Sequence, residues 1–118
     1  MNITPTFKDG ILTLTLSGKL DTFGAGPVQQ VLDAYFPKHP QFIIMDMTNV
    51  DFISSAGIRV LLITAKEAEG RKGRLALVGL NPYVRELITS THIAGILEQF
   101  ATLEQAEAFC RGQTPPGA

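Results

Sequence analysis

The chain has 118 residues, of which 45% are hydrophobic and 18% are charged, so it can fold around one sizeable core and is not expected to be disordered. Ten basic and eleven acidic residues almost cancel, and without a basic block the chain is not expected to bind nucleic acid. No apolar run spans a bilayer, no signal peptide is visible, and the single cysteine excludes an internal disulfide. We expect a cytoplasmic protein with one domain over residues 1–112 and a flexible tail over residues 113–118.

The first third of the chain predicts a hairpin followed by a helix. Residues 3–7 and 11–17 are typical of strands, and alternation of leucine with threonine gives the second strand one core face and one wet face. An Asp-Gly pair between them is a hairpin signal. Apolar residues at helical spacing over residues 28–35 then predict an amphipathic helix, which the prolines within residues 37–40 end.

The middle third predicts a buried strand that leads into a second helix. Residues 42–47 are mostly apolar and favour a central strand. A mostly polar loop is expected to follow, and the helix is expected to start near Gly57 and to stop at Gly70. Its predicted inner face consists of Ile58, Leu61, Leu62, Ala65 and Ala68.

The last third predicts two more strands and two more helices. Residues 74–80 and 96–100 are typical of a strand and a short edge strand. Asn81 followed by proline starts one helix, and a capping box over residues 102–105 starts the last. Strands alternating with helices predict an α/β fold, a mixed sheet of four to five strands with about four helices, in which an antiparallel hairpin is followed by parallel strands.

Ser54 and Ser55 lie within residues 46–61, the segment that carries most of the information in the chain. They stand between the central strand and the second helix, where free backbone N–H groups and the helix dipole favour a negative charge. A phosphate on one of them would be well placed, which makes the segment a candidate switch. The alternative is an N-cap worth about 1 kcal/mol. Both interpretations are compatible, because only one serine needs to cap.

Other candidate site residues have ordinary structural explanations. Gly57 would let a partner's backbone approach, but relief of crowding in a tight strand–helix turn is favoured. Asp21, Asp46 and Asp51 would suit Mg²⁺ or acid–base work, although loop carboxylates more often bond to turn backbone. We favour that explanation for Asp46 and leave Asp21 open. No histidine has a metal-ligand spacing, and the nucleotide loops and the nucleophile elbow of a serine hydrolase are absent.

Residues 46–61 resemble the signature of the STAS family, the domain shared by sulfate transporters and anti-sigma factor antagonists. Residues 18–21 resemble the family's earlier glycine-x-leucine-aspartate element, and the two later helix starts fall where the family has its third and last helices. The resemblance covers residues 3–110. It implies a mixed sheet with helices mainly on one side, in agreement with the element order.

The resemblance also implies a function. Stand-alone members bind, when unphosphorylated, a serine kinase that is also an anti-sigma factor, and so free the sigma factor; phosphorylation blocks binding and a phosphatase restores it. Ser55 matches the phosphoacceptor, whereas Ser54 replaces an acidic residue and Ala56 replaces a second serine. The alternative from the same family is a non-phosphorylated accessory subunit of a lipid-transport ATP-binding-cassette complex, in which Ser55 only caps the helix.

We expect the second helix to carry part of the partner surface. Helical spacing turns Val60 and Ile63 away from the core, beside Arg59, one turn beyond Ser55. Alternatively another element covers these apolar residues. No cofactor is expected, because the partner kinase supplies ATP and Mg²⁺, and the sequence does not predict an oligomeric state. The residues predicted to bind the partner are Asp21, Ser54, Ser55, Gly57, Arg59, Val60 and Ile63.

Overall fold

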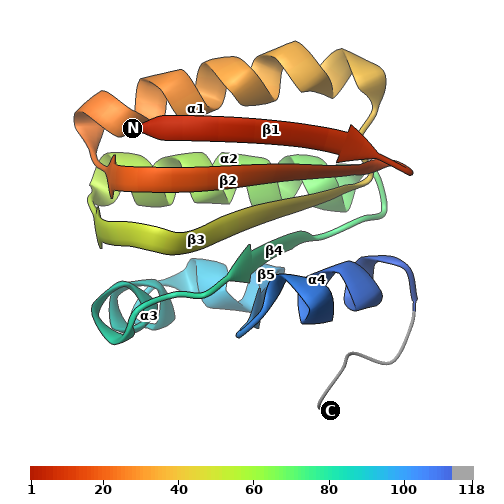
Figure 1. Ribbon diagram of the computed structural model, residues 1–118. Helices are drawn as coiled ribbons and strands as arrows, with labels where there is room; N and C mark the ends of the chain where they lie inside the picture. The colour runs from red at the N-terminus through yellow and green to blue at the C-terminus, as the bar shows by residue number, and fades with distance from the viewer. Residues whose placement is uncertain (113–118) are drawn as a thin grey trace.

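The structure is a computed structural model that describes residues 1–112. After an opening hairpin, strands and helices alternate and form one mixed sheet with helices on both faces (Figure 1). This confirms the expected α/β class. The expected tail over residues 113–118 lies outside the described residues. In chain order the elements are β1 (Asn2–Lys8), β2 (Ile11–Leu20), α1 (Thr22–Tyr35), η1 (Phe36–Lys38), β3 (Phe42–Ile53), α2 (Ser55–Gly70), β4 (Leu75–Val78), α3 (Pro82–Thr89), η2 (His92–Ile96), β5 (Leu97–Phe100) and α4 (Leu103–Cys110).

The five strands of the sheet lie in the order β1-β2-β3-β4-β5. β1 pairs with β2 antiparallel, and the other three pairs are parallel, as expected. Parallel neighbours need crossover connections, so the chain returns through a helix after each of β2, β3 and β4. The ends of β2, β3 and β4 at Leu20, Ile53 and Val78 therefore lie at one end of the sheet, and α1, α2 and α3 all begin there (Figure 1). We call this end the carboxyl edge.

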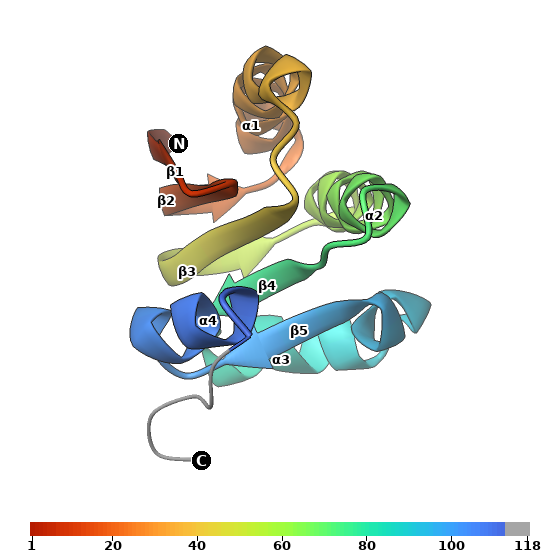
Figure 2. The same cartoon turned by 90° about the vertical axis from the view of Figure 1, so that its right-hand side faces the viewer.

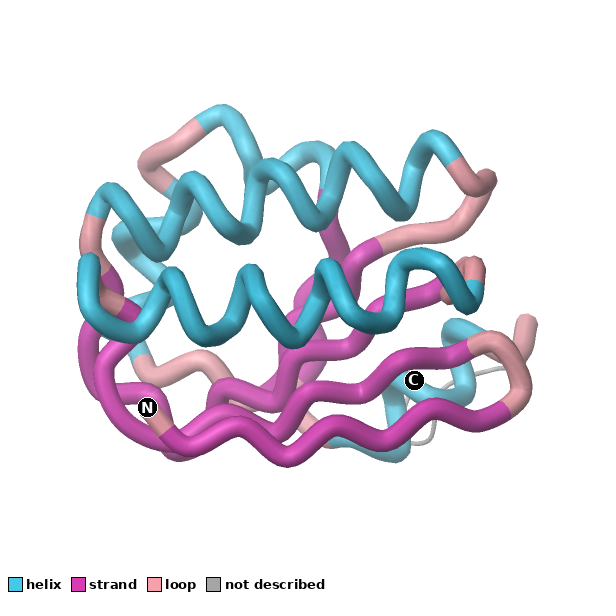
Figure 3. Tube along the Cα trace, turned by 90° about the horizontal axis from the view of Figure 1, so that it is seen from above, coloured by secondary structure: helices cyan, strands magenta, loops and turns pink. Residues whose placement is uncertain are grey.

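Two apolar clusters fix the layers. The larger joins the sheet to α1, α2 and α3 through fully buried side chains such as Leu32, Leu61 and Val84. The smaller joins the opposite face of the sheet to α4, with Ile44 and Ala106 at its centre. Figure 2 shows α1 and α2 on one side of the sheet and α4 on the other. Figure 3 shows α1 and α2 side by side along the strands, so each covers part of the other's flank.

The opening hairpin has the predicted form. Asp9 and Gly10 both have positive φ, 55° and 76°, as a two-residue type I′ turn requires. In β2, Leu14 is fully buried whereas Thr15 is exposed, which confirms the core face and the wet face. The wet face stays open because α4 packs against β3, β4 and β5.

The polar loop expected after residue 47 is instead part of β3. The strand continues to Ile53 because β2 also runs on to Leu20, and the two strands stay paired to their ends through two shifts in register. Val50 and Ile53 bury their side chains, while residues 48, 49, 51 and 52 remain exposed. β4 pairs with β3 no further than Asp46, so the last part of β3 projects beyond β4. This extension carries the two serines to the carboxyl edge.

The later helices begin as predicted. The Asn81 side chain accepts a hydrogen bond from the Val84 backbone N–H at 2.7 Å, and the capping box at Thr102 is present. α2 ends at Gly70 as expected, but the left-handed residue that follows is Lys72, with φ 62°. None of the helices formed by residues 1–112 is long and apolar enough to cross a membrane.

Candidate functional site

Ser54 and Ser55 lie at the carboxyl edge, between the end of β3 and the start of α2. The Ser54 backbone N–H donates to the Leu20 carbonyl oxygen at 3.0 Å, and its own carbonyl oxygen accepts from the Ile58 N–H at 2.9 Å. The first bond joins the segment to the end of β2, and the second opens the helix. The backbone of Ser54 is therefore bonded both to β2 and to α2.

Ser54 occupies the N-cap position without capping the helix. Its side chain makes no bond to the first turn of α2, and its hydroxyl oxygen is buried without a hydrogen-bond partner. The other three α-helices within residues 1–112 are each capped by a side chain, from Asp21, Asn81 and Thr102. The expectation that one serine caps was therefore wrong. The N–H groups at the start of α2 have no side-chain acceptor, where a phosphate oxygen would be a favourable one.

Ser55 is the first residue of α2 and is exposed. Within the described part of the chain its hydroxyl has no hydrogen-bond partner. The neighbouring serines thus differ in access: Ser55 is exposed to solvent, and the Ser54 hydroxyl oxygen is enclosed by protein. A modifying enzyme would meet Ser55 first.

Gly57 faces the interior rather than a partner. It is buried, and a Cβ atom at this position would lie 2.2 Å from the Leu20 carbonyl oxygen and 2.8 Å from Ile53 Cγ1. This supports the relief of crowding and contradicts the interpretation of Gly57 as a contact residue. Gly24 has the same role in α1, where a Cβ would lie 2.2 Å from the Lys19 carbonyl oxygen. Both helices start directly against the end of β2, and a glycine in each permits it.

The acidic residues do not form a joint site. Asp21 Oδ1 accepts from the N–H groups of Phe23 and Gly24 at 3.0 and 2.9 Å, so this carboxylate caps α1. Asp46 Oδ1 accepts from the Thr48 N–H at 3.1 Å, which confirms the local interpretation of that residue. In residues 1–112 no group of three or more His, Cys, Asp or Glu side chains is arranged to hold a metal ion.

The outer face of α2 is narrower than predicted. Arg59 is exposed and Ile63 is 38% exposed, but Val60 is only 6% exposed and belongs to the main core. Val60 was therefore wrongly assigned to the partner surface. The inner stripe is rotated toward Gly57, Val60, Leu61, Thr64, Ala65 and Ala68.

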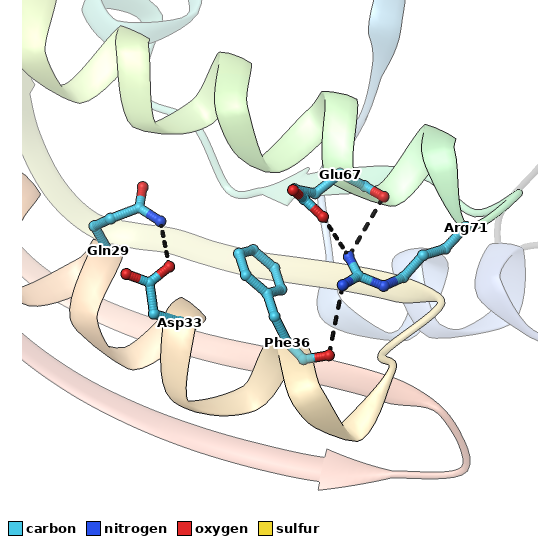
Figure 4. A network of polar contacts seen from close by, with 5 residues as sticks. All are labelled: Gln29, Asp33, Phe36, Glu67 and Arg71. Atoms are coloured by element: carbon cyan, nitrogen blue, oxygen red, sulfur yellow. Dashed lines mark hydrogen bonds and ion pairs between the residues drawn. The ribbon is translucent and has the colours of Figure 1, made fainter.

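Val60 is buried because α1 covers one flank of α2. α1 packs beside α2, so the buried arc of α2 faces both the sheet and a helix. At the far end Arg71 donates to Glu67 at 2.9 Å and to the Phe36 carbonyl oxygen at 3.5 Å, and it lies over the Phe36 ring (Figure 4). Figure 4 also shows Gln29 donating to Asp33 along α1. The contacts of Arg71 with Phe36 therefore join the end of α2 to the turn that follows α1.

Three exposed aromatic residues at this edge were missed by sequence reasoning. Phe23 is 88% exposed in the first turn of α1, Tyr83 is 48% exposed in the first turn of α3, and Phe52 is 36% exposed near the end of β3. The available signal was an aromatic residue two positions after each of the capping residues Asp21 and Asn81. Residues so close to a helix start are not in the periodic stripe that predicts burial.

Comparison with known proteins agrees with this geometry. The family model described as "STAS domain" matches residues 2–106. "Putative anti-sigma factor antagonist BtrV" from Bordetella bronchiseptica is 34% identical over 92% of this chain and 90% of its own length. An anti-sigma factor antagonist from Mycobacterium paratuberculosis has a crystal structure with a TM-score of 0.83 at 24% identity, covering 93% of each chain. The Bacillus cell fate determinant SpoIIAA in its phosphorylated form has a TM-score of 0.72 at 20% identity, covering 95% of this chain and all of its own.

Proposed function

Because this chain belongs to the STAS domain family, we propose that it is an anti-sigma factor antagonist, switched by phosphorylation of Ser55. In the unphosphorylated state it binds an anti-sigma factor serine kinase, and the sigma factor is released. The name of the relative from Bordetella bronchiseptica supports the class of activity. The observation that carries the switch is local: Ser55 is exposed at the start of α2, the one uncapped α-helix among residues 1–112.

The start of α2 suits a phosphate electrostatically. A phosphoserine carries about −1.5 to −2 charges at neutral pH. The positive end of the helix dipole and the N–H groups without a side-chain acceptor offset part of that charge, by about 1 kcal/mol. The fold therefore survives modification, while a partner surface that had to desolvate the new charge would no longer bind. The existence of SpoIIAA in a phosphorylated form shows that a protein of this fold tolerates a phosphate.

The partners follow from this chemistry. The kinase supplies ATP and Mg²⁺, a serine phosphatase removes the phosphate, and the chain itself acts by binding rather than as an enzyme. A partner that consumes ATP assigns the switch to the cytoplasm. Ser54 keeps its hydroxyl buried and holds the neighbouring acceptor in place through its backbone bonds to Leu20 and Ile58. Asp21 holds the neighbouring helix start, and the exposed Arg59 and Ile63 continue the contact surface along α2.

The assignment of the acceptor is tested by mass spectrometry. The protein is incubated with ATP, Mg²⁺ and each anti-sigma factor kinase of the host, and its mass and fragments are measured. Wild type and Ser54→Ala should gain one phosphate on residue 55, and Ser55→Ala should gain none. Unchanged labelling of Ser55→Ala would refute Ser55 as the acceptor. Absence of labelling and of binding with every kinase would refute the proposed function.

The switch itself is tested with Ser55→Asp. We expect this variant to bind the kinase at least about tenfold more weakly, since a charge now lies in the contact surface. Its melting temperature should stay close to that of the wild type, because the carboxylate lies at a favourable helix end. Titration calorimetry and thermal melts measure the two properties. If Ser55→Asp binds the kinase with wild-type affinity, the electrostatic mechanism is refuted. If the variant loses much of its stability, Ser55 has a structural role.

A further inference from the structure

The exposed large apolar side chains gather at one end of the molecule. Among residues 1–112 there are four such side chains, Phe23, Phe52, Ile63 and Tyr83, and all except Ile63 come from the carboxyl edge. We call Phe23, Phe52 and Tyr83 the aromatic edge. Scattered exposed apolar residues are common on monomers, whereas a group of them in one place marks an interaction site.

The aromatic edge is held in place by the backbone of the site. Phe23 is positioned by its own N–H, which donates to Asp21 Oδ1 at 3.0 Å. Phe52 lies in β3 opposite Lys19 of β2. The Tyr83 ring lies 6.4 Å from the Phe52 ring, centroid to centroid, at an interplanar angle of 32°.

A hydrogen bond also ties the start of α3 to the same strand. The Asn81 side-chain Nδ2 donates to the Val50 carbonyl oxygen at 3.2 Å. The Oδ1 atom of the same side chain accepts from the Val84 N–H and so caps α3. Tyr83 is therefore held near Phe52 by the loop as well as by the ring contact. Phe23 lies in the first turn of α1 and Tyr83 in the first turn of α3. The start of α2, which carries Ser55, lies between these two helix starts (Figure 1).

The fold does not use the Phe23 side chain. At 88% exposure it contributes little to the core, although the burial of a phenylalanine ring is strongly favourable. That free energy remains available to a partner that covers the ring. Aromatic side chains at the centre of a contact are frequent hot spots, since they bring a large area at a small loss of conformational entropy.

We propose that the aromatic edge is the apolar part of the surface that docks on the anti-sigma factor kinase, with Phe23 as its main anchor. The inference rests on the proposed function. A kinase that phosphorylates Ser55 must bring its active site to the Ser55 hydroxyl, so its surface also meets the ends of β2 and β3 and the starts of the three helices. Because the aromatic edge adjoins the Ser55 acceptor, the kinase is the partner that we expect to cover it.

This arrangement also explains why phosphate would release the partner. A charge of about −1.5 to −2 would stand between apolar side chains that lose their water on binding. Desolvating an unpaired charge is costly, and the kinase patch that matches Phe23, Phe52 and Tyr83 would itself be apolar. The switch would then act by desolvation cost and need no change of fold.

The test compares three variants of α1 by titration calorimetry with the purified kinases of the host in ADP and Mg²⁺. Phe23→Ser should weaken binding at least about tenfold, a loss typical of a hot spot. Phe23→Leu should stay within about threefold, because it keeps most of the apolar area. Ala34→Ser, also exposed on α1 but at its other end, should bind like the wild type. Thermal melts should show the same fold for all four proteins.

The outcomes separate the two proposals. If the wild type binds a kinase and Phe23→Ser binds it equally well, the aromatic edge is not the docking surface, while the proposed function stands. If Phe23→Leu loses as much affinity as Phe23→Ser, apolar area does not drive the contact and the anchor is refuted. If no kinase binds the wild type, the proposed function and the docking surface are both refuted.

Discussion

Replacing Gly57 with alanine tests whether close packing at the start of α2 holds the site in place. A Cβ atom there would lie 2.2 Å from the Leu20 carbonyl oxygen, 2.9 Å from Leu20 Cγ and 2.8 Å from Ile53 Cγ1. The nearest of these atoms belongs to the backbone of β2, which is fixed in the sheet and cannot rotate away. The start of α2 must therefore move outward.

The magnitude follows from two destabilising effects and one stabilising effect. Overpacking in a core costs about 1–3 kcal/mol, and a contact with fixed backbone belongs at the upper end. Moving α2 also stretches the 3.0 Å bond from the Ser54 N–H to the Leu20 carbonyl oxygen, worth about 1 kcal/mol. Alanine gains back about 1 kcal/mol as the better helix former. We expect a net loss of at least about 2 kcal/mol, or a melting temperature lower by about 8 °C.

Gly70→Ala is the matched control. Gly70 is the last residue of the same helix, and a Cβ there meets no atom within 4 Å. This variant should be as stable as the wild type or more stable by up to about 1 kcal/mol. Urea titration and thermal melts of both variants decide the question. If Gly57→Ala equals or exceeds the wild type in stability, the packing of α2 on the end of β2 is not as close as described.

Two further predictions concern the caps and the cysteine. Asp21→Ala should lower the free energy of unfolding by about 1 kcal/mol through loss of its cap, whereas Ser54→Ala should change it by less than about 0.5 kcal/mol; equal losses in urea titrations would show that Ser54 does cap α2. Burial raises the pKa of the Cys110 thiol from 9.0 to about 11, with Glu107 adding to the shift and Arg111 opposing it. The stabilisation from the protonated thiol should be complete below pH 9 and be lost as pH rises toward about 11, because the unfolded thiol deprotonates first; Cys110→Ala should abolish that part of the decline, and an unchanged pH profile in the variant would refute the assignment.

The order of the elements followed from local patterns in the sequence. Leucine and threonine alternate in β2, an Asp-Gly turn closes the hairpin, and capping residues precede α3 and α4. Each of these patterns depends on neighbours within a few residues, and the strand, turn or helix start that it predicts is present in the structure. The pair Ser54 and Ser55 could likewise be placed before a helix from the chain alone.

Contacts between distant residues decided what local patterns could not. The segment 48–51 is polar enough for a loop, yet it is a strand because β2 lies alongside and pairs with its backbone. Val60 would face outward on a helix packed only on a sheet, but α1 closes that flank.

Within the site itself, the sequence determined that two hydroxyls stand at the start of α2, while the tertiary structure decided what each can do. The Ser54 oxygen is buried without a partner, and Ser55 is exposed. Adjacent serines carry identical groups, and local spacing does not distinguish their environments. The placement of Phe23, Phe52 and Tyr83 at one end of the molecule likewise depends on how three crossovers return to the same end of the parallel strands, because burial and proximity are set by residues far apart in the chain.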